Sequence, residues 1–191
     1  MGGETAEHPR RAAYADAIRD VSGSSTGIIE ESEIIDGKLI RESDIVIGIE
    51  SSGLHSNGYT LIRDMLWRQK IILKDMPELL NQTIIYASEV KNLLDEVPIL
   101  GMAHITGGGI PENLPRCIPD NVTVSVDYDS WPMPELFSKI MLAGEIPPEE
   151  MINVFNLGIG YCVVVPKEVV KDTQDIITQH ELRSWVIAET K

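Results

Sequence analysis

The sequence predicts an α/β (α+β) domain in which helices pack on a mixed β-sheet. Short runs rich in β-branched residues alternate along the chain with segments whose apolar residues recur at helical spacing, as in layered α/β folds. Of the 191 residues, 43% are hydrophobic but only 5% are aromatic, so aliphatic side chains must form most of the core. A chain of this length buries enough surface to fold without disulfides or metal ions.

The first half of the chain contributes two predicted strands and two predicted helices. Strands are expected at 28–33 and at 44–50, and the second of these is β-branched and ends in a Ser-Ser-Gly breaker. Helices are expected at 60–70, where apolar residues fall at helical spacing, and at 84–94.

The second half continues the alternation. A strand is expected at 100–105, followed by three glycines and a short helix. Pro111 fits the first turn of that helix, because an N–H group has no helical partner there in any case. Residues 122–127 alternate apolar and polar side chains as a strand does. The further predicted elements are helices at 134–143 and 148–155, a strand at 160–165, a helix at 167–180 and a strand at 185–187.

Residues 1–20 are predicted to be an arm or linker, because this polar stretch has no apolar face, and 21–191 to be one domain. No apolar run reaches the roughly 20 residues of a bilayer span, and no secretory signal is recognisable, so a cytoplasmic protein is expected. The two cysteines, Cys117 and Cys162, are expected to be unpaired thiols, and no metal ligand is assigned.

Acidic residues strongly outnumber basic residues. The chain has 16 Lys and Arg against 30 Asp and Glu, for a formal net charge of -14. This charge disfavours polyanionic partners, so neither nucleic acid nor an anionic membrane is expected. A small anionic ligand needs a locally neutral site, and residues 101–119 are neutral.

The loop at 51–60 combines glycine with hydrogen-bonding side chains and carries no formal charge. It joins a strand to a helix, which is where ligands bind in many α/β sheets. The Asn57-Gly58 pair favours a turn with positive φ. Such a turn would expose His55, Ser56 and Asn57 together with backbone N–H groups. A plain turn whose Ser and Asn side chains cap the next helix is the alternative, although a turn does not require a histidine.

A second candidate site is the segment 103–113, with three successive glycines at 107–109 before a predicted helix. Glycine lets the backbone approach a ligand, and the amino terminus of a helix offers N–H groups to an anion. A phosphate site is therefore predicted, to which a metal ion or a second polypeptide would add positive charge. His104 either faces the ligand or is a buried core histidine, and Glu112 and Asn113 either bind the ligand or cap the helix.

The loop at 156–161 has glycines at alternate positions, Gly158 and Gly160, within an apolar run. Such glycines mark a β-bulge or a close approach of two backbones. A structural role is therefore favoured over a functional one.

Four motifs in this order resemble a known family. They are Gly-Gly-Glu-Thr-Ala-Glu at 2–7, Ser-Ser-Gly-Leu-His-Ser-Asn-Gly-Tyr at 51–59, Ala-His-Ile-Thr-Gly-Gly-Gly-Ile-Pro-Glu-Asn-Leu-Pro-Arg at 103–116 and Phe-Asn-Leu-Gly-Ile-Gly at 155–160. Together they resemble the phosphoribosylformylglycinamidine cyclo-ligases, or aminoimidazole ribonucleotide synthetases, over essentially the whole chain. The resemblance implies an ATP-dependent ring closure in purine biosynthesis. Phosphorylation would activate the amide oxygen of formylglycinamidine ribonucleotide, and the amidine nitrogen would displace it, giving aminoimidazole ribonucleotide, ADP and phosphate.

The resemblance also implies that the chain is a carboxyl-terminal domain. Family members carry an amino-terminal domain that supplies most contacts to ATP and Mg²⁺ and much of the dimer interface, and nothing in this sequence corresponds to it. The motif at 2–7 resembles the joint between the domains, so Glu4, Thr5 and Glu7 would lie on the ATP side. The partners implied are a phosphoribosyl substrate, an amino-terminal domain in cis or in trans, and a second copy in a homodimer.

The resemblance assigns two groups of site residues to the carboxyl-terminal wall of the active cleft. His104, His55 and Asn57 would be catalytic, with either histidine as the proton shuttle and Asn57 as a positioning group. The residues expected to bind substrate or phosphate are Ser56, Gly58, Thr106, Gly107, Gly108, Gly109, Glu112 and Asn113.

One departure from the family pattern lies at 82–86, where the usual Pro-Thr-Arg-Ile-Tyr is replaced by Gln-Thr-Ile-Ile-Tyr. The missing arginine puts in doubt one polar or phosphate contact that the family pattern implies. The alternative function is a non-catalytic descendant of the same superfamily that binds a nucleotide or a partner protein.

Overall fold

The computed structural model describes residues 23–191, so the arm expected at 1–20, with Glu4, Thr5 and Glu7, lies outside the described residues. The chain divides into two units between Ile34 and Ile35. In the first unit the strand expected at 28–33 is wrong. Residues 31–33 form a short 3-10 helix, η2 (Glu31–Glu33), and the side chains of Ile28 and Ile29 are exposed. Two adjacent apolar residues between Gly27 and Glu30 provide no buried face for a sheet.

The second unit is built on a four-stranded sheet with the order β2-β3-β1-β4. The strands are β1 (Ile45–Glu50), β2 (Gly101–His104), β3 (Ile159–Val165) and β4 (Ser184–Glu189). The predicted fold class, a sheet packed with helices, is confirmed. The three ladders between these strands are all antiparallel, where the sequence suggested a mixed sheet. The alternation of element types does not fix strand direction, because the connections are long enough to return the chain either way.

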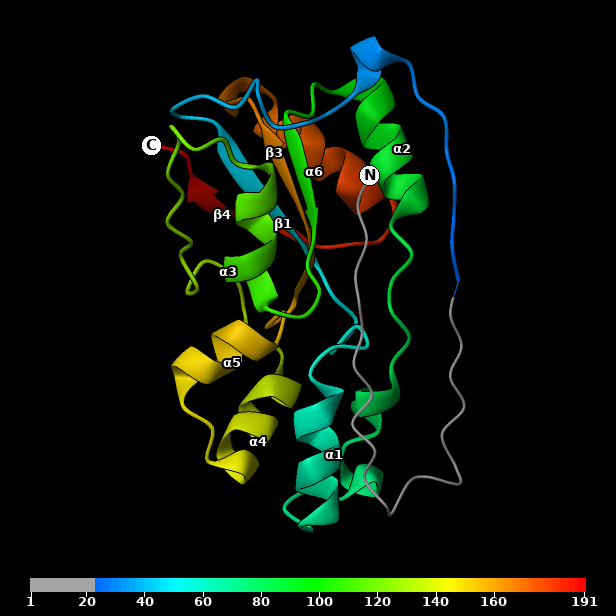
Figure 1. Ribbon diagram of the computed structural model, residues 1–191, viewed down its shortest axis with the longest axis vertical. Coiled ribbons are helices and arrows are strands. Elements are labelled where there is room, and N and C mark those ends of the chain that lie inside the picture. The colour runs from blue at the N-terminus through cyan, green and yellow to red at the C-terminus, as the bar shows by residue number, and fades with distance from the viewer. Residues whose placement is uncertain (1–22) are drawn as a thin grey trace. The chain divides into compact units, whose positions relative to one another are not determined.

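Helices cover both faces of this sheet (Figure 1). The α-helices are α1 (Tyr59–Trp67), α2 (Ala87–Glu96), α3 (Gly109–Asn113), α4 (Glu135–Gly144), α5 (Pro148–Val154) and α6 (Val170–Gln179). Short 3-10 helices are η3 (Leu73–Asp75), η4 (Pro77–Leu80), η5 (Leu114–Cys117) and η6 (Lys167–Val169). The predicted helices are confirmed, with ends that differ by a few residues. Among residues 23–191, no helix has the length and apolar character needed to cross a membrane.

The alternation of side chains along β1 explains why both faces of the sheet are buried. Ile45, Ile47 and Ile49 pack in one apolar cluster with residues of α2 and α6, including Leu93 and Ile176. On the opposite face, Val46 of β1 packs in a second cluster with residues of α3. A strand covered on both faces is expected to be apolar almost throughout, as β1 and β3 are.

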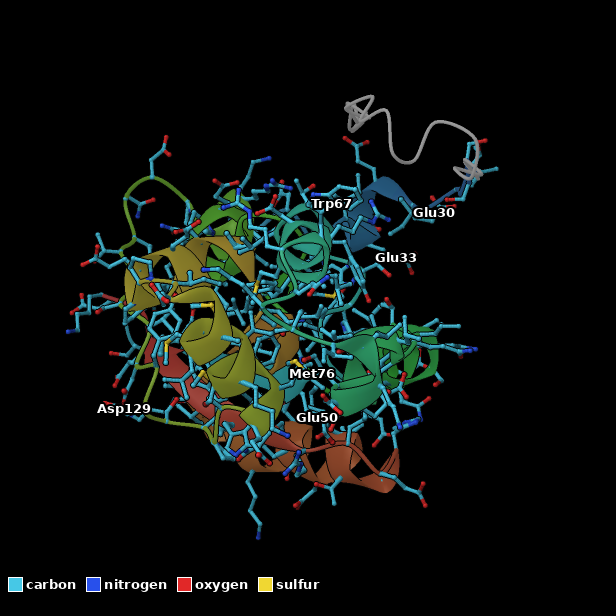
Figure 2. All side chains as sticks on the ribbon, turned by 90° about the horizontal axis from the view of Figure 1, so that it is seen from below. Glu30, Glu33, Glu50, Trp67, Met76 and Asp129 are labelled. Atoms are coloured by element: carbon cyan, nitrogen blue, oxygen red, sulfur yellow. The ribbon has the colours of Figure 1, made fainter. Side chains whose placement is uncertain are left out.

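A third apolar cluster fills the space between α1, α4 and α5. Phe137 of α4 and Phe155, which follows α5, are fully buried, and their ring centroids lie 6.0 Å apart. Figure 2 looks at the molecule from this end, with Met76 of the cluster and Glu50 of β1 labelled. Each buried aromatic ring contributes roughly 1.5–3 kcal/mol to stability. Because Leu54 of the loop that precedes α1 packs in the same cluster, the cluster stabilises that loop.

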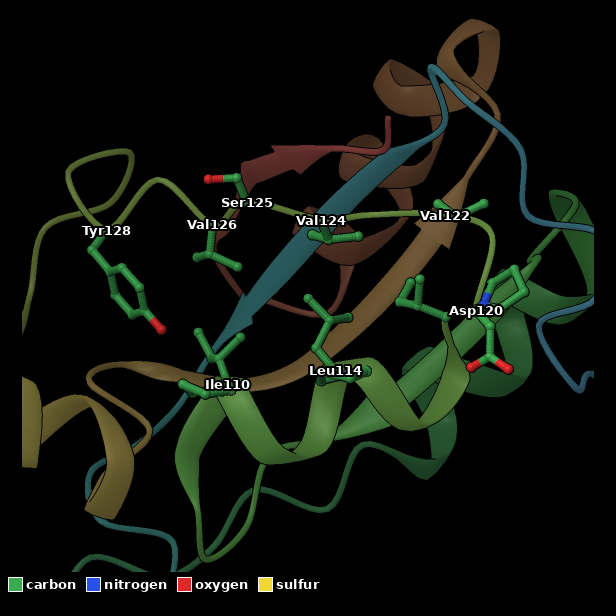
Figure 3. A pocket seen from close by; sticks show the side chains of 12 residues that line it. Ile110, Leu114, Asp120, Val122, Val124, Ser125, Val126 and Tyr128 are labelled. Atoms are coloured by element: carbon green, nitrogen blue, oxygen red, sulfur yellow. The ribbon is translucent and has the colours of Figure 1, made fainter.

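The strand expected at 122–127 is wrong, because this segment forms only one isolated bridge, between Val124 and Thr190. It pairs with the end of the chain through Thr123 and, further along, donates one hydrogen bond from Asp127 to the carbonyl of Ile187. These contacts share one antiparallel register, but they are too few to form a continuous ladder. A cavity of about 610 Å³ lies between the segment and α3 (Figure 3). It is lined mainly by aliphatic side chains and contains none of the predicted site residues.

Candidate active site

Both candidate loops leave the same end of the sheet. Strands β1 and β2 each pair antiparallel with β3, so they run in the same direction on either side of it. Their last residues, Glu50 and His104, lie opposite Ile159 and Tyr161 at the start of β3. The topology thus brings together two loops that are about 50 residues apart in the sequence, at the carboxyl ends of strands, where ligand sites tend to occur.

The first loop turns sharply before α1. His55, Ser56 and Gly58 have φ angles of 49°, 62° and 73°. Gly58 is the N-cap of α1, and no side chain caps this helix, so the helix-capping alternative is wrong for this loop. Instead, the Asn57 amide donates to the carbonyl of His55 at 2.8 Å. A Cβ on Gly58 would collide with the Phe155 ring, so the turn itself needs glycine at this position.

The His55 ring is held beneath this loop and is only 4% exposed. Its Nε2 accepts hydrogen bonds from the backbone N–H groups of Ser52, at 3.0 Å, and Ile84, at 3.4 Å. Because an N–H group can only donate, the proton of the neutral ring is on Nδ1. Nδ1 is buried and has no hydrogen-bond partner within the described residues. Burial, and next the charge of His104, lower the pKa of His55 to about 4, so the ring is neutral at pH 7.

This lowered pKa makes stability depend on pH. His55 has an ordinary pKa of 6.5 when unfolded and about 4 when folded, so its contribution is complete above 6.5 and is lost as pH falls towards 4. At about 1.4 kcal/mol per pKa unit, the loss is on the order of 2–3 kcal/mol. We expect His55→Gln to remove this part of the pH dependence of urea unfolding, and His104→Gln to leave most of it. An unchanged pH dependence in His55→Gln would contradict this assignment.

The second loop is organised by Asn113, which is 3% exposed. Its amide donates to the carbonyl oxygens of Gly109 at 2.7 Å, Gly107 at 3.1 Å and Thr106 at 3.4 Å. Its Oδ1 accepts the hydroxyl of Thr106 at 3.1 Å. No side chain caps α3, whose N-cap is Gly108, so the helix-capping alternative is wrong here too. The Asn113 side chain instead stabilises the glycine turn by hydrogen bonds to the backbone carbonyls of the turn.

The glycine turn presents two unused donors. Gly107 is exposed and Gly108 has a φ of 88°. In the described part of the chain, neither of their N–H groups has an acceptor, whereas that of Gly109 donates to Thr106 at 3.1 Å. A Cβ on Gly109 would collide with the carbonyl of Ile152. Gly109 is thus fixed by packing, while Gly107 and Gly108 can bind an anion or a developing oxyanion.

Two other predicted residues lie beside these loops. Ser56 is exposed, and its Oγ lies 3.4 Å from Oγ1 of Thr83. Glu112 is also exposed, and its carboxylate lies against Gly108, where a Cβ would be 2.5 Å from the carboxyl carbon. Because this carboxylate is negative, an anion would meet less repulsion on the Gly107 side of the turn.

The structure brings the three predicted catalytic residues together. Oδ1 of Asn57 lies 3.9 Å from the position of a Cβ on Gly107, so the two loops are neighbours. The Tyr86 ring lies between the histidines, with its centroid 6.0 Å from His55 and 6.3 Å from His104. His104 is exposed at the end of β2, in contrast to the buried His55. The core-histidine alternative for His104 is therefore wrong.

Two tyrosines, Tyr86 and Tyr161, pack against the predicted histidines and were not predicted as site residues. Tyr161 of β3 stacks on His104 with ring centroids 6.0 Å apart and an interplanar angle of 30°. Tyr86 lies 5.3 Å from Tyr161. Tyr86 ends the segment that departs from the family pattern, and Tyr161 follows Gly160, so the only signal was their place next to motifs already noted.

The predicted structural role of the loop at 156–161 is confirmed. Asn156 is 1% exposed; it donates to the carbonyl of Gly53 and accepts from the N–H of Gly158. At Gly160 the ladder between β1 and β3 shifts register, which is the expected bulge. A Cβ on Gly160 would lie 2.7 Å from Nδ1 of His55, so this glycine makes room for the histidine.

The remaining ionisable groups give no metal site. Within residues 23–191, no three His, Cys, Asp or Glu side chains gather closely enough to hold a metal ion. The prediction of unpaired thiols is confirmed for both Cys117 and Cys162. Burial raises the pKa of each thiol, which disfavours the reactive thiolate.

Comparison with protein families gives one match, to the family described as "AIR synthase related protein, C-terminal domain", over residues 41–191. A protein of Prochlorococcus marinus (strain MIT 9313) named phosphoribosylformylglycinamidine cyclo-ligase is 42% identical over 100% of this chain and 58% of its own length. A protein of the same name from Thermosynechococcus vestitus is 40% identical over 98% of this chain and 57% of its own length. The chain thus spans less than two thirds of these relatives.

Solved structures share the fold at low identity. Escherichia coli HypE matches with a TM-score of 0.59 at 15% identity, over 81% of this chain and 45% of HypE. Thermotoga maritima PurL complexed with AMPPCP matches with a TM-score of 0.54 at 15% identity, over 85% of this chain and 24% of PurL. These likenesses support the fold described above.

Proposed function

Because the chain belongs to the family of AIR synthase related proteins and contains its C-terminal domain, we propose that it is the carboxyl-terminal part of an ATP-dependent phosphoribosylformylglycinamidine cyclo-ligase. The observation that carries this proposal is the meeting of the two loops. An exposed histidine, His104, and two unused backbone donors, at Gly107 and Gly108, belong to one loop, and Gly107 of that loop lies next to Asn57 of the other. This arrangement combines a proton carrier with an oxyanion or phosphate site, as a ring closure through a phosphorylated amide requires.

The two histidines have different roles in this proposal. His104 is exposed, so it is the group that would carry a proton to or from the substrate. His55 is buried and neutral, with Nε2 occupied by backbone donors. We therefore assign His55 to shaping the first loop. Asn57 is held by its bond to the His55 carbonyl and would position the substrate.

The backbone donors would act on the oxygen that leaves the substrate. When the amidine nitrogen attacks the activated amide carbon, negative charge develops on the phosphorylated oxygen and its phosphoryl group. The N–H groups of Gly107 and Gly108 are fixed by the Asn113 bonds to the loop carbonyls. Donors held in advance stabilise such charge without reorganisation.

ATP and Mg²⁺ would be held mainly by the amino-terminal domain that the family resemblance implies. Thermotoga maritima PurL, which shares the fold, was solved with the ATP analogue AMPPCP. The described residues offer no cluster of acidic or histidine side chains for a metal, and we place the Mg²⁺ ligands on that domain. It would join this chain in cis or in trans and would supply much of a dimer interface.

A chimera tests the proposal. The carboxyl-terminal 58% of the Prochlorococcus marinus relative, which this chain matches over its whole length, is replaced by residues 1–191. We expect the purified chimera to convert formylglycinamidine ribonucleotide and ATP to aminoimidazole ribonucleotide and ADP, and the separate chain to form no product. A chimera that unfolds cooperatively but binds only nucleotide would support the non-catalytic descendant instead.

A further inference from the structure

Tyr86 has no role in the proposed chemistry, yet it contacts every ring of the site. It is 6% exposed and immediately precedes α2. Its ring lies within 6.3 Å, centroid to centroid, of His55, His104 and Tyr161. A tyrosine needed only for the core would not have to lie between two histidines from different loops.

The Tyr86 hydroxyl is anchored to the rigid end of the sheet. It donates to the carbonyl oxygen of Glu50, the last residue of β1, at 2.6 Å. Glu50 is itself fixed, because its carboxylate accepts hydrogen bonds from the backbone N–H and Nε of Arg183, at 2.7 and 2.8 Å. Arg183 directly precedes β4. The Tyr86 side chain is therefore fixed at its backbone, at the start of α2, and at its hydroxyl, by the hydrogen bond to β1.

The Tyr86 hydroxyl also packs closely against the backbone of β3. A Cβ on Gly160 would collide with the Tyr86 hydroxyl and would lie 2.6 Å from Cε1 of His55. Both side chains thus pack directly on the backbone of the bulge in β3. Burial raises the pKa of Tyr86, and the charges of Glu50, Cys162 and Glu89 raise it further. The phenol is therefore protonated at neutral pH and can donate its hydrogen bond to Glu50.

From this geometry we propose that Tyr86 is a positioning residue, which sets the distance and orientation of the His55 loop relative to His104. The inference builds on the proposed function, because it concerns the same site. The ring is a direct neighbour of both histidines, and the hydroxyl fixes that ring to β1. The Tyr161 ring, which stacks on His104 and lies 5.3 Å from the Tyr86 ring, completes the frame. A displaced His104 would no longer be aligned for proton transfer, although substrate could still bind to the glycine loop.

Three variants separate positioning from stability. Tyr86→Phe keeps the ring and loses the hydrogen bond to Glu50, whereas Tyr86→Leu loses both. Tyr59→Leu is the matched control, because Tyr59 also donates its hydroxyl to a backbone carbonyl, that of Leu79, but packs in the apolar cluster of α1 and α4. The first readout is the ¹H–¹³C NMR signals of the histidine rings in the 191-residue chain, which require no catalytic activity.

We expect Tyr86→Leu to shift the ring signals of both His55 and His104, Tyr86→Phe to shift them much less, and Tyr59→Leu to leave them unchanged. In the chimera, Tyr86→Leu should lower kcat by about 10–100-fold with little change in KM, and Tyr86→Phe should retain most of kcat. The account is overturned if folded Tyr86→Leu keeps both histidine signals in place. It is also overturned if Tyr59→Leu lowers kcat as much. An inactive chimera with the expected NMR shifts would reject the proposed function and leave the positioning role standing.

Discussion

His104→Ala in the chimera is expected to lower kcat by about 10²–10⁴-fold, the usual range for loss of a general acid or base. The side chain is exposed at the end of β2 and contacts the rings of Tyr86 and Tyr161. Truncation removes no buried hydrogen bond, so the variant should fold. The KM for formylglycinamidine ribonucleotide should change much less, because the backbone donors of the glycine turn remain. Steady-state kinetics of product formation measures both constants.

His180→Ala is the matched control for that variant. His180 follows α6, and its ring contacts Asn92 and Glu89 rather than the candidate loops. Its loss should leave kcat within about twofold, since no group near the substrate is moved. A decrease of less than tenfold in His104→Ala would reject the proton-transfer role of His104.

Asn113→Ala is expected to lower the free energy of unfolding by roughly 3 kcal/mol and to remove most of the activity of the chimera. The amide makes bonds to three loop carbonyls and one hydroxyl while almost fully buried. Each buried polar group left without a partner costs about 1–3 kcal/mol. The glycine turn would then lose its fixed shape, so KM for the substrate should rise together with the loss of kcat.

Urea unfolding of the 191-residue chain measures the first effect. Asn92→Ala provides the comparison, because the Asn92 amide is only partly buried and its bond goes to His180. It should cost less than about 1 kcal/mol. Equal costs for the two variants would show that Asn113 does not hold the turn.

The sequence was most informative where structure depends on local chemistry. A turn with positive φ at Gly58 and a bulge at Gly160 follow from the conformational freedom of glycine, and both are present. The β-branched run at 44–50 and the apolar run at 160–165 were likewise predicted as strands, and both are present as β1 and β3. The meeting of the two loops could be expected only from the family resemblance, since it depends on both strands flanking β3.

Features that depend on distant partners could not be predicted. Strands were predicted at 28–33 and 122–127 from local patterns, but a strand forms only when it pairs with a neighbouring strand. No strand pairing is described for residues 28–33, and residues 122–127 form a single bridge. The burial of His55 depends on Ser52 and Ile84. Tyr86 acts through Glu50, 36 residues away. No local pattern in the sequence marks such contacts.

The most direct test of the central claim follows one oxygen atom through the reaction of the chimera. Formylglycinamidine ribonucleotide labelled with ¹⁸O in the amide is incubated with ATP, and the phosphate and the imidazole product are analysed by mass spectrometry. Because the amide oxygen is phosphorylated and then displaced, we expect aminoimidazole ribonucleotide to form with the label in phosphate, and His104→Ala to suppress both. A folded chimera that forms no imidazole product, or that forms it without label in phosphate, would contradict the account.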